Sequence, residues 1–102
     1  MKVRKFNESL NEDEPKIGDY IIIKYDSIVG NAYNFITNNI GKFIKYNSNR
    51  TFPYQIEFFN IPNDIESYFN NNCRNYKYEE ILYWSNNKEE LELLIQSNKF
   101  NI

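Results

Sequence analysis

The stretch that decides the fold is Ile17-Gly18-Asp19-Tyr20-Ile21-Ile22-Ile23-Lys24. Its Gly-Asp pair is a turn signal placed directly before a run of β-forming residues. Side chains alternate between the two faces of a strand, so Ile21, Ile23 and Tyr25 are expected to share one face. We predict this strand over residues 19–25. Two later runs have the same character, Ile40-Gly41-Lys42-Phe43-Ile44-Lys45 and Tyr54-Gln55-Ile56-Glu57-Phe58-Phe59.

These later runs predict strands over residues 41–46 and 54–59, paired as a hairpin through a polar turn. Between the first and second strands, apolar residues at helical spacing predict a short helix over residues 31–39. Asn63 and Asn86 each precede a Glu by three residues, which resembles a capping box. Helices are therefore expected from these positions to about residues 72 and 96. Residues 79–85 fit either a fourth strand or a helix.

Length and composition indicate one globular domain. A chain of 102 residues, of which 41 % are hydrophobic, is long enough to bury one core without disulfide or metal support. The first 16 residues mix charges of both signs and contain few large apolar side chains. We therefore expect residues 1–16 to form an N-terminal arm and residues 17–102 to form a single α+β domain.

The sequence also predicts where the protein works. No apolar run approaches the roughly 20 residues of a membrane span, and no apolar segment follows the basic first residues. Cys73 is the single cysteine, so no intramolecular disulfide can form, which is typical of a reducing compartment. We expect a cytoplasmic protein that does not bind membranes.

The order of these elements resembles the small SH3-like barrels, including their KOW-like and Tudor-like variants. The resemblance covers about residues 17–85 and rests on Gly18-Asp19 before one strand and Ile40-Gly41-Lys42 before another. It implies a small SH3-like antiparallel β-barrel with inserted short helices and a C-terminal helix. Barrels of this kind usually bind other molecules and seldom carry catalytic chemistry. The chain is also similar to small proteins of phages and large DNA viruses.

Catalysis is disfavoured by the residue inventory. The chain has no His, so acid–base work would fall to carboxylates, Tyr, Lys or Cys. The pairs Glu79-Glu80 and Glu89-Glu90 are sequence neighbours, whose side chains point in different directions on a helix or a strand. Clustered His and Cys ligands for a metal are absent. We expect no enzyme activity, no metal site and no cofactor.

Two exposed stretches are candidates for binding a protein partner. Tyr and Arg are the residues that dominate binding hot spots, and loops are favoured binding places. The turn between the second and third strands contains Arg50 and Phe52, and a polar-aromatic stretch expected as a loop contains Arg74, Tyr76 and Tyr78. The alternative is that these aromatic rings fold back onto the sheet.

The hairpin is also a candidate for binding RNA or DNA. Lys42, Lys45 and Arg50 interleave with aromatic residues such as Tyr46, a pattern that can contact phosphates and stack on bases. Against it, the net charge is −2, whereas nucleic-acid binders usually present a basic surface. The alternative is that these rings pack inward and the lysines only keep the surface hydrated.

Residue usage adds an expectation about origin. Asn, Ile, Lys, Tyr and Phe are abundant and have AT-rich codons, which indicates an AT-rich genome such as that of a phage or a large DNA virus. The leading hypothesis is a non-catalytic module that docks on a host protein complex and inhibits or modulates it, for example an anti-CRISPR-type inhibitor. An RNA- or DNA-binding barrel is the alternative. A homo-oligomer built through sheet edges is a third hypothesis.

Overall fold

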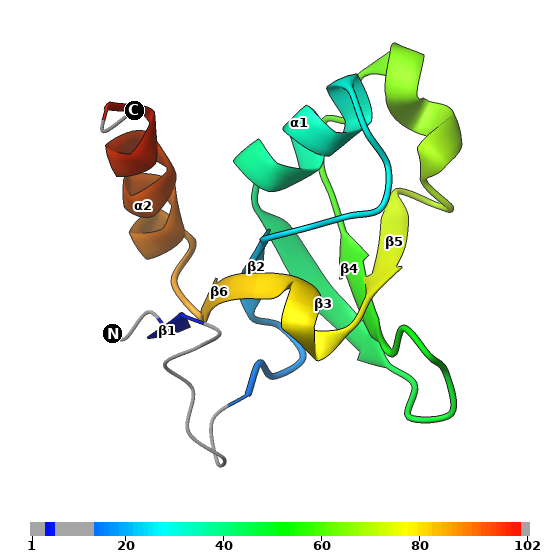
Figure 1. Cartoon of the computed structure of the whole chain (residues 1–102). Coiled ribbons are helices and arrows are strands. Elements are labelled where there is room, and N and C mark those ends of the chain that lie inside the picture. The colour runs from blue at the N-terminus through cyan, green and yellow to red at the C-terminus, as the bar shows by residue number, and fades with distance from the viewer. Residues whose placement is uncertain (1–3, 6–13, 101–102) are drawn as a thin grey trace.

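The computed structural model describes residues 4–5 and 14–100, with side chains described over residues 14–97. It is an α+β fold built on one antiparallel sheet, with a helix at the C-terminal end (Figure 1). The elements in chain order are β1 (Arg4–Lys5), β2 (Tyr20–Ile23), α1 (Asn31–Asn38), β3 (Gly41–Tyr46), β4 (Tyr54–Glu57), η2 (Asn63–Tyr68), β5 (Cys73–Tyr76), η3 (Tyr78–Glu80), β6 (Ile81–Ser85) and α2 (Lys88–Phe100).

The sheet is strongly bent but it is not closed. The strand order is β1-β6-β2-β3-β4-β5, so β1 and β5 form the two edges, and no pairing among the described residues joins them. Register shifts between Ile22 and Ile23 in β2, and between Phe43 and Lys45 in β3, bend the strands as bulges do. The predicted barrel is therefore corrected to an open, bent antiparallel sheet, because its edge strands stay unpaired with each other.

Several predicted elements are confirmed, and others are corrected. Helix α1, strand β3 and the β3–β4 hairpin lie where the sequence predicted them. The second helix is a 3₁₀ helix, η2, and residues 79–85 are settled as the end of η3 followed by strand β6. The predicted loop that starts at Arg74 is wrong, because residues 73–76 form β5, paired with β4.

The two described pieces of the predicted N-terminal arm both contact the sheet. Arg4 and Lys5 form β1, paired with Trp84 and Tyr83 of β6. Further along, the hydroxyl of Tyr54 donates a 3.4 Å hydrogen bond to a carboxylate oxygen of Glu14. Residues 6–13 of the predicted arm lie outside the described residues.

The core lies on the inner face of the bent sheet. It is made of Ile, Phe, Tyr and Trp side chains that come from every strand between β2 and β6. The predicted alternation in β4 is confirmed, since Tyr54 and Ile56 are buried while Gln55 is partly exposed. In β2, Ile21 and Ile23 are buried together in the core as predicted, and Ile22 is buried as well, whereas Tyr25 lies beyond the strand and is 55 % exposed, so its predicted place is wrong. Both faces of β2 are therefore covered.

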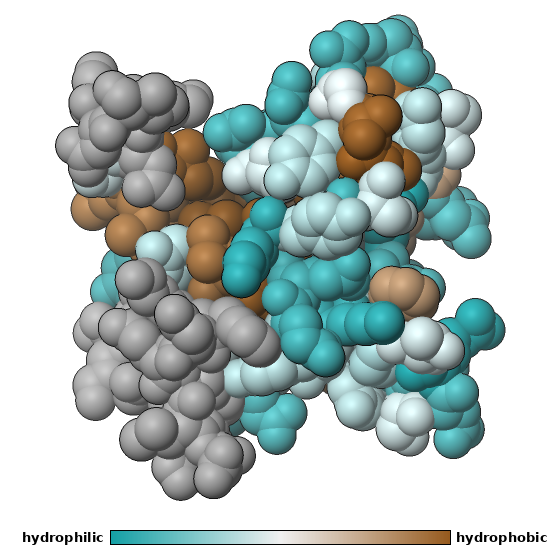
Figure 2. Space-filling model, in the orientation of Figure 1, coloured by the Kyte–Doolittle hydropathy of each residue, from teal (hydrophilic) through white to brown (hydrophobic). Residues whose placement is uncertain are grey.

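The helices lie at different places around the sheet. Helix α1 contacts β2 and η2, whereas α2 contacts β6 and β2 and stands apart from α1 (Figure 1). Hydrophobic residues gather on the visible face near the base of α2, while the side that carries the β3–β4 hairpin is mostly hydrophilic (Figure 2). In the described part of the chain, no helix has both the length and the apolar character needed to cross a membrane.

Candidate binding site

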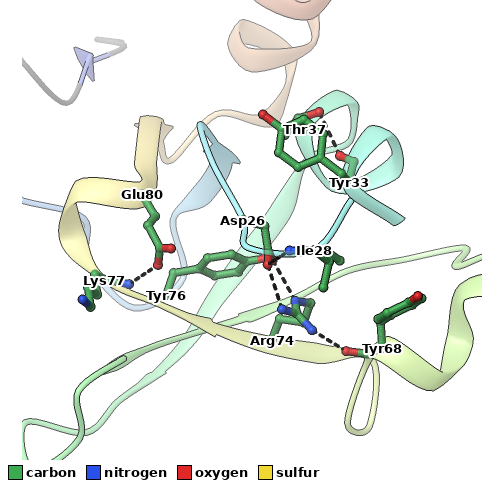
Figure 3. Close-up of polar contacts among 9 residues, drawn as sticks. All are labelled: Asp26, Ile28, Tyr33, Thr37, Tyr68, Arg74, Tyr76, Lys77 and Glu80. Atoms are coloured by element: carbon green, nitrogen blue, oxygen red, sulfur yellow. Dashed lines mark hydrogen bonds and ion pairs between the residues drawn. The ribbon is translucent and has the colours of Figure 1, made fainter. Parts of the chain in front are cut away.

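A buried acid, Asp26, is held by two residues of β5. Arg74 donates to it from Nε (to Oδ2) and from Nη2 (to Oδ1), each at 2.8 Å, and the Tyr76 hydroxyl donates to Oδ2 at 2.8 Å (Figure 3). The backbone N–H of Ile28 adds a fourth bond at 3.2 Å. Asp26 is only 3 % exposed, so this pairing is what makes a carboxylate tolerable there.

The network fixes the protonation states of its members. Burial raises the pKa of the Asp26 carboxyl, but the hydrogen bonds from Arg74, Tyr76 and Ile28 outweigh burial and bring the pKa below its ordinary value. Burial and the neighbouring Asp26 charge raise the pKa of the Tyr76 hydroxyl. Burial lowers the pKa of Arg74, yet its bonds to Asp26 leave it raised overall. An ion pair with a neutral tyrosine is therefore the resting state.

Arg74 also connects three segments of the fold. While two of its nitrogens hold Asp26 in the loop after β2, Nη1 donates a 2.7 Å hydrogen bond to the backbone carbonyl of Tyr68 at the end of η2 (Figure 3). The edge strand β5 is thereby tied to both segments. Among the described residues, no buried side-chain nitrogen or oxygen lacks a hydrogen-bond partner. The buried polar groups of the network are all paired within the protein, which is typical of a network that stabilises the fold.

A groove of about 220 Å³ lies beside the Asp26–Arg74 network, between the turn of the β3–β4 hairpin and β5. We call it the hairpin groove. Phe52 and Pro53 give it an apolar wall, and none of its lining residues carries a carboxylate. Its polar lining consists of three basic residues, Lys45, Arg50 and Arg74, and four amides, Asn47, Gln55, Asn70 and Asn75.

The register of the sheet orders part of this lining. Lys45 is directly opposite Gln55, and Gln55 is directly opposite Asn75, so the three form one row across β3, β4 and β5. Residues directly opposite each other in a sheet point to the same face. The row therefore places one ammonium and two amides side by side on the outer face, on strands rather than on a loop.

A second, wider cavity of about 660 Å³ adjoins the hairpin groove. It shares Arg50, Phe52, Arg74 and Asn75 with the groove, but its lining also includes Asp26 and Glu80. Glu80 accepts a 2.8 Å hydrogen bond from the N–H of Lys77, and burial raises the pKa of its carboxyl. The adjoining cavity thus has mixed charge, whereas the hairpin groove is lined by cations and neutral groups only.

The structure brings together four residues that the sequence singled out. Lys45, Arg50, Phe52 and Arg74 all line the hairpin groove, although two came from the protein-binding hypothesis, one from the nucleic-acid hypothesis and one from both. Arg50 is exposed, and Phe52 is 42 % exposed with the Lys77 ammonium 5.1 Å from its ring centre.

Four other residues that the sequence singled out lie elsewhere. Tyr76 has no exposed surface to offer a partner, and Tyr78 is half-buried with its ring centre 6.0 Å from that of Trp84. Lys42 lies over the ring of Tyr20, at 5.7 Å from its centre. Tyr46 packs edge-on against the Tyr54 ring. Neither Lys42 nor Tyr46 lines the groove, so the proposed nucleic-acid set is divided.

Sequence reasoning missed the residues that complete the site. Asp26 follows the first predicted strand without any motif of its own, and its partner Arg74 is 48 residues away. Gln55 and Asn75 were not singled out from the sequence. Gln55 lies on the solvent-facing side of a strand in which apolar and polar residues alternate. That alternation was the one available signal for Gln55, and Asn75 had none because β5 was not recognised.

The described side chains were compared with the requirements of a metal site. Among the described side chains, no three Cys, Asp or Glu residues gather as a metal site would require. Cys73 is buried, with its sulfur 3.4 Å from the backbone oxygen of Asn71. Comparisons of the chain with protein-family models, with curated proteins and with solved structures found no match.

Proposed function

We propose that the chain is a non-catalytic binding module that docks on a protein through the hairpin groove. The observation that carries the proposal is a difference among the three basic side chains that line the groove. Arg74 is held by Asp26 and the Tyr68 carbonyl, whereas Lys45 and Arg50 form no side-chain hydrogen bond or ion pair within the described part of the chain. A rigid wall with free charged groups is suited to recognising a partner.

The proposal extends to the setting in which the protein acts. The chain is a phage- or virus-encoded protein of the host cytoplasm that inhibits or modulates a host protein complex, for example as an anti-CRISPR-type inhibitor. Support for that origin comes from the abundance of Asn, Ile, Lys, Tyr and Phe, whose codons are AT-rich. The finer fold proposal is an SH3-like arrangement, supported by the antiparallel β3, β4 and β5 and by the bulges that bend the sheet.

The experiment is a tagged pull-down from a nuclease-treated lysate of the host cell, read by mass spectrometry. We expect one stoichiometric protein with the unchanged chain and its loss with the double variant Arg50→Ala, Phe52→Ala. Both residues are exposed and carry little of the fold, so the variant should keep its stability. Lys88→Ala on α2 is the matched control, and it should retain the partner. Equal capture by all three chains would disprove docking through the groove.

A second candidate function is RNA or DNA binding through Lys42, Lys45, Tyr46 and Arg50. It is favoured by the lining of the hairpin groove, which contains three basic residues and no carboxylate. It predicts binding of an oligonucleotide that weakens steeply as salt is raised, because phosphate contacts release counterions. Binding that is absent, or that does not change with salt, would remove this candidate.

A further inference from the structure

We infer that the hairpin groove recognises an acidic segment of a protein, with carboxylates on Arg50 and Lys45 and the segment's backbone on Gln55 and Asn75. This inference rests on the proposed docking function and specifies the chemistry of the partner. Three properties of the groove support it: its available charge, its amide row, and the carboxylates and the covered ring at its border.

The first property is the charge that a ligand can reach. Three of the five N–H donors of the Arg74 guanidinium are already engaged, two by Asp26 and one by the Tyr68 carbonyl, and only 21 % of the side chain is exposed, so less of it is open to a ligand. Arg50 and Lys45 supply the accessible charge. A guanidinium presents two parallel N–H donors that match the two oxygens of a carboxylate, and such charge-assisted pairs are among the stronger hydrogen bonds.

The second property is the amide row. Gln55 and Asn75 stand side by side on the outer face of β4 and β5, next to Lys45. A side-chain amide both donates and accepts hydrogen bonds, as a peptide group does. Two neighbouring amides can therefore pair with the N–H and C=O groups of an extended peptide, while Lys45 and Arg50 bind its acidic side chains.

The third property disfavours a nucleic acid. A phosphate backbone carries charge at every nucleotide, and here it would meet the partly exposed carboxylate of Glu80 in the adjoining cavity. Glu57, opposite Lys42 on the same outer face, adds a further carboxylate. The ring of Phe52, which would have to stack on a base, already has the Lys77 ammonium over it. A peptide can place its few carboxylates only where the cations are.

The test is an NMR titration of the ¹⁵N-labelled full chain with three probes: hexaglutamate, hexaglutamine and single-stranded hexathymidylate. We expect hexaglutamate to shift the backbone amides of residues 47–55 and Asn75, and hexaglutamine to shift them much less. Arg50→Gln should weaken hexaglutamate binding about tenfold, the effect of losing one charge-assisted hydrogen bond. Lys88→Gln, which removes the same charge on α2, should leave the affinity unchanged.

Other outcomes overturn the inference. Shifts confined to other surfaces, or equal affinity of Arg50→Gln and the unchanged chain for hexaglutamate, would show that the groove does not read carboxylates. Tighter binding of hexathymidylate at the same amides would show that the groove binds nucleic acid and not an acidic peptide. If the pull-down partner is lost with the double variant Arg50→Ala, Phe52→Ala while hexaglutamate gives no shifts, docking stands and the acidic segment is wrong. If hexaglutamate binds as expected but no partner is captured, the acidic specificity stands and the docking proposal fails.

Discussion

Arg74 and Asp26 lie 48 residues apart in the sequence, yet they form a bidentate ion pair in which both donor–acceptor distances are 2.8 Å. Asp26 is in the loop after β2, and Arg74 is on the edge strand β5. The pair therefore closes a long segment of the chain that contains α1, the β3–β4 hairpin and η2. Arg74 also lines the hairpin groove, so the same residue takes part in the stability of the fold and in the lining of the groove.

Removing the arginine should be costly. Arg74→Ala leaves the buried Asp26 carboxylate without its cation, and breaking a buried pair in this way costs about 3 kcal/mol of unfolding free energy. Lys45→Ala removes an exposed cation from the same groove and should change stability by less than about 0.5 kcal/mol. Urea denaturation followed by tryptophan fluorescence measures both. Equal midpoints for the two variants would contradict a stabilising role for the pair.

Stability should fall in acid through Asp26. Its pKa is lower in the folded chain than in the unfolded chain, so the unfolded state binds the proton more readily. The stabilisation is complete above the unfolded pKa of about 3.9 and is lost as pH falls through the lower folded pKa. Urea denaturation between about pH 5 and pH 2.5 measures the loss. The double variant Asp26→Asn, Arg74→Gln lacks this group, and a pH dependence as steep as that of the unchanged chain would refute the assignment.

The tyrosine hydroxyl should contribute less than the arginine. Tyr76→Phe keeps the buried ring and removes a single 2.8 Å hydrogen bond to Asp26, so we expect a loss of about 1.5 kcal/mol. Tyr46→Phe makes the same chemical change on a ring that is 49 % exposed and should be nearly neutral. Thermal or urea unfolding compares the two. A neutral Tyr76→Phe would mean that Arg74 and Ile28 satisfy Asp26 without help.

Gly41 should not accept a side chain. A Cβ at this position would overlap the Cγ2 methyl of Ile56 and lie 3.1 Å from the backbone oxygen of Glu57. Overpacking of this kind costs about 2 kcal/mol, so Gly41→Ala should be destabilised by that amount. Ile56→Leu removes the methyl from the β-carbon, and in a double-mutant cycle it should recover part of the loss. Strictly additive effects would show that the overlap is not the cause.

Local signals in the sequence predicted the elements with strong periodicity. Helix α1 and strand β3 were correctly placed because helical apolar spacing and a glycine that opens a run of β-forming residues are local properties. Strand β5 was missed because Cys73-Arg74-Asn75-Tyr76 has no such alternation, and its burial comes from pairing with β4. The 3₁₀ form of η2 was missed for a similar reason, since its capping-box sequence also fits an α-helix.

The candidate site shows the same division. Arg50 and Phe52 were identified from the sequence because a polar turn between two strands is exposed wherever the hairpin packs. Tyr76 was misplaced, because its burial depends on the core side chains and on Asp26, all of which are distant in sequence. Whether an aromatic residue binds a partner or fills a core is decided by its neighbours in space, which composition does not specify.

By itself, the sequence determined the α+β class, the β3–β4 hairpin and the exposure of the hairpin turn. These follow from spacing within a few residues, where backbone geometry leaves few choices. Only the tertiary structure decided that the sheet stays open, that Arg74 is committed to Asp26, and that Lys45, Arg50, Gln55 and Asn75 share one groove. The physical reason is that strand order, register and ion pairing join residues far apart in the chain, and their free energy depends on the whole packed fold.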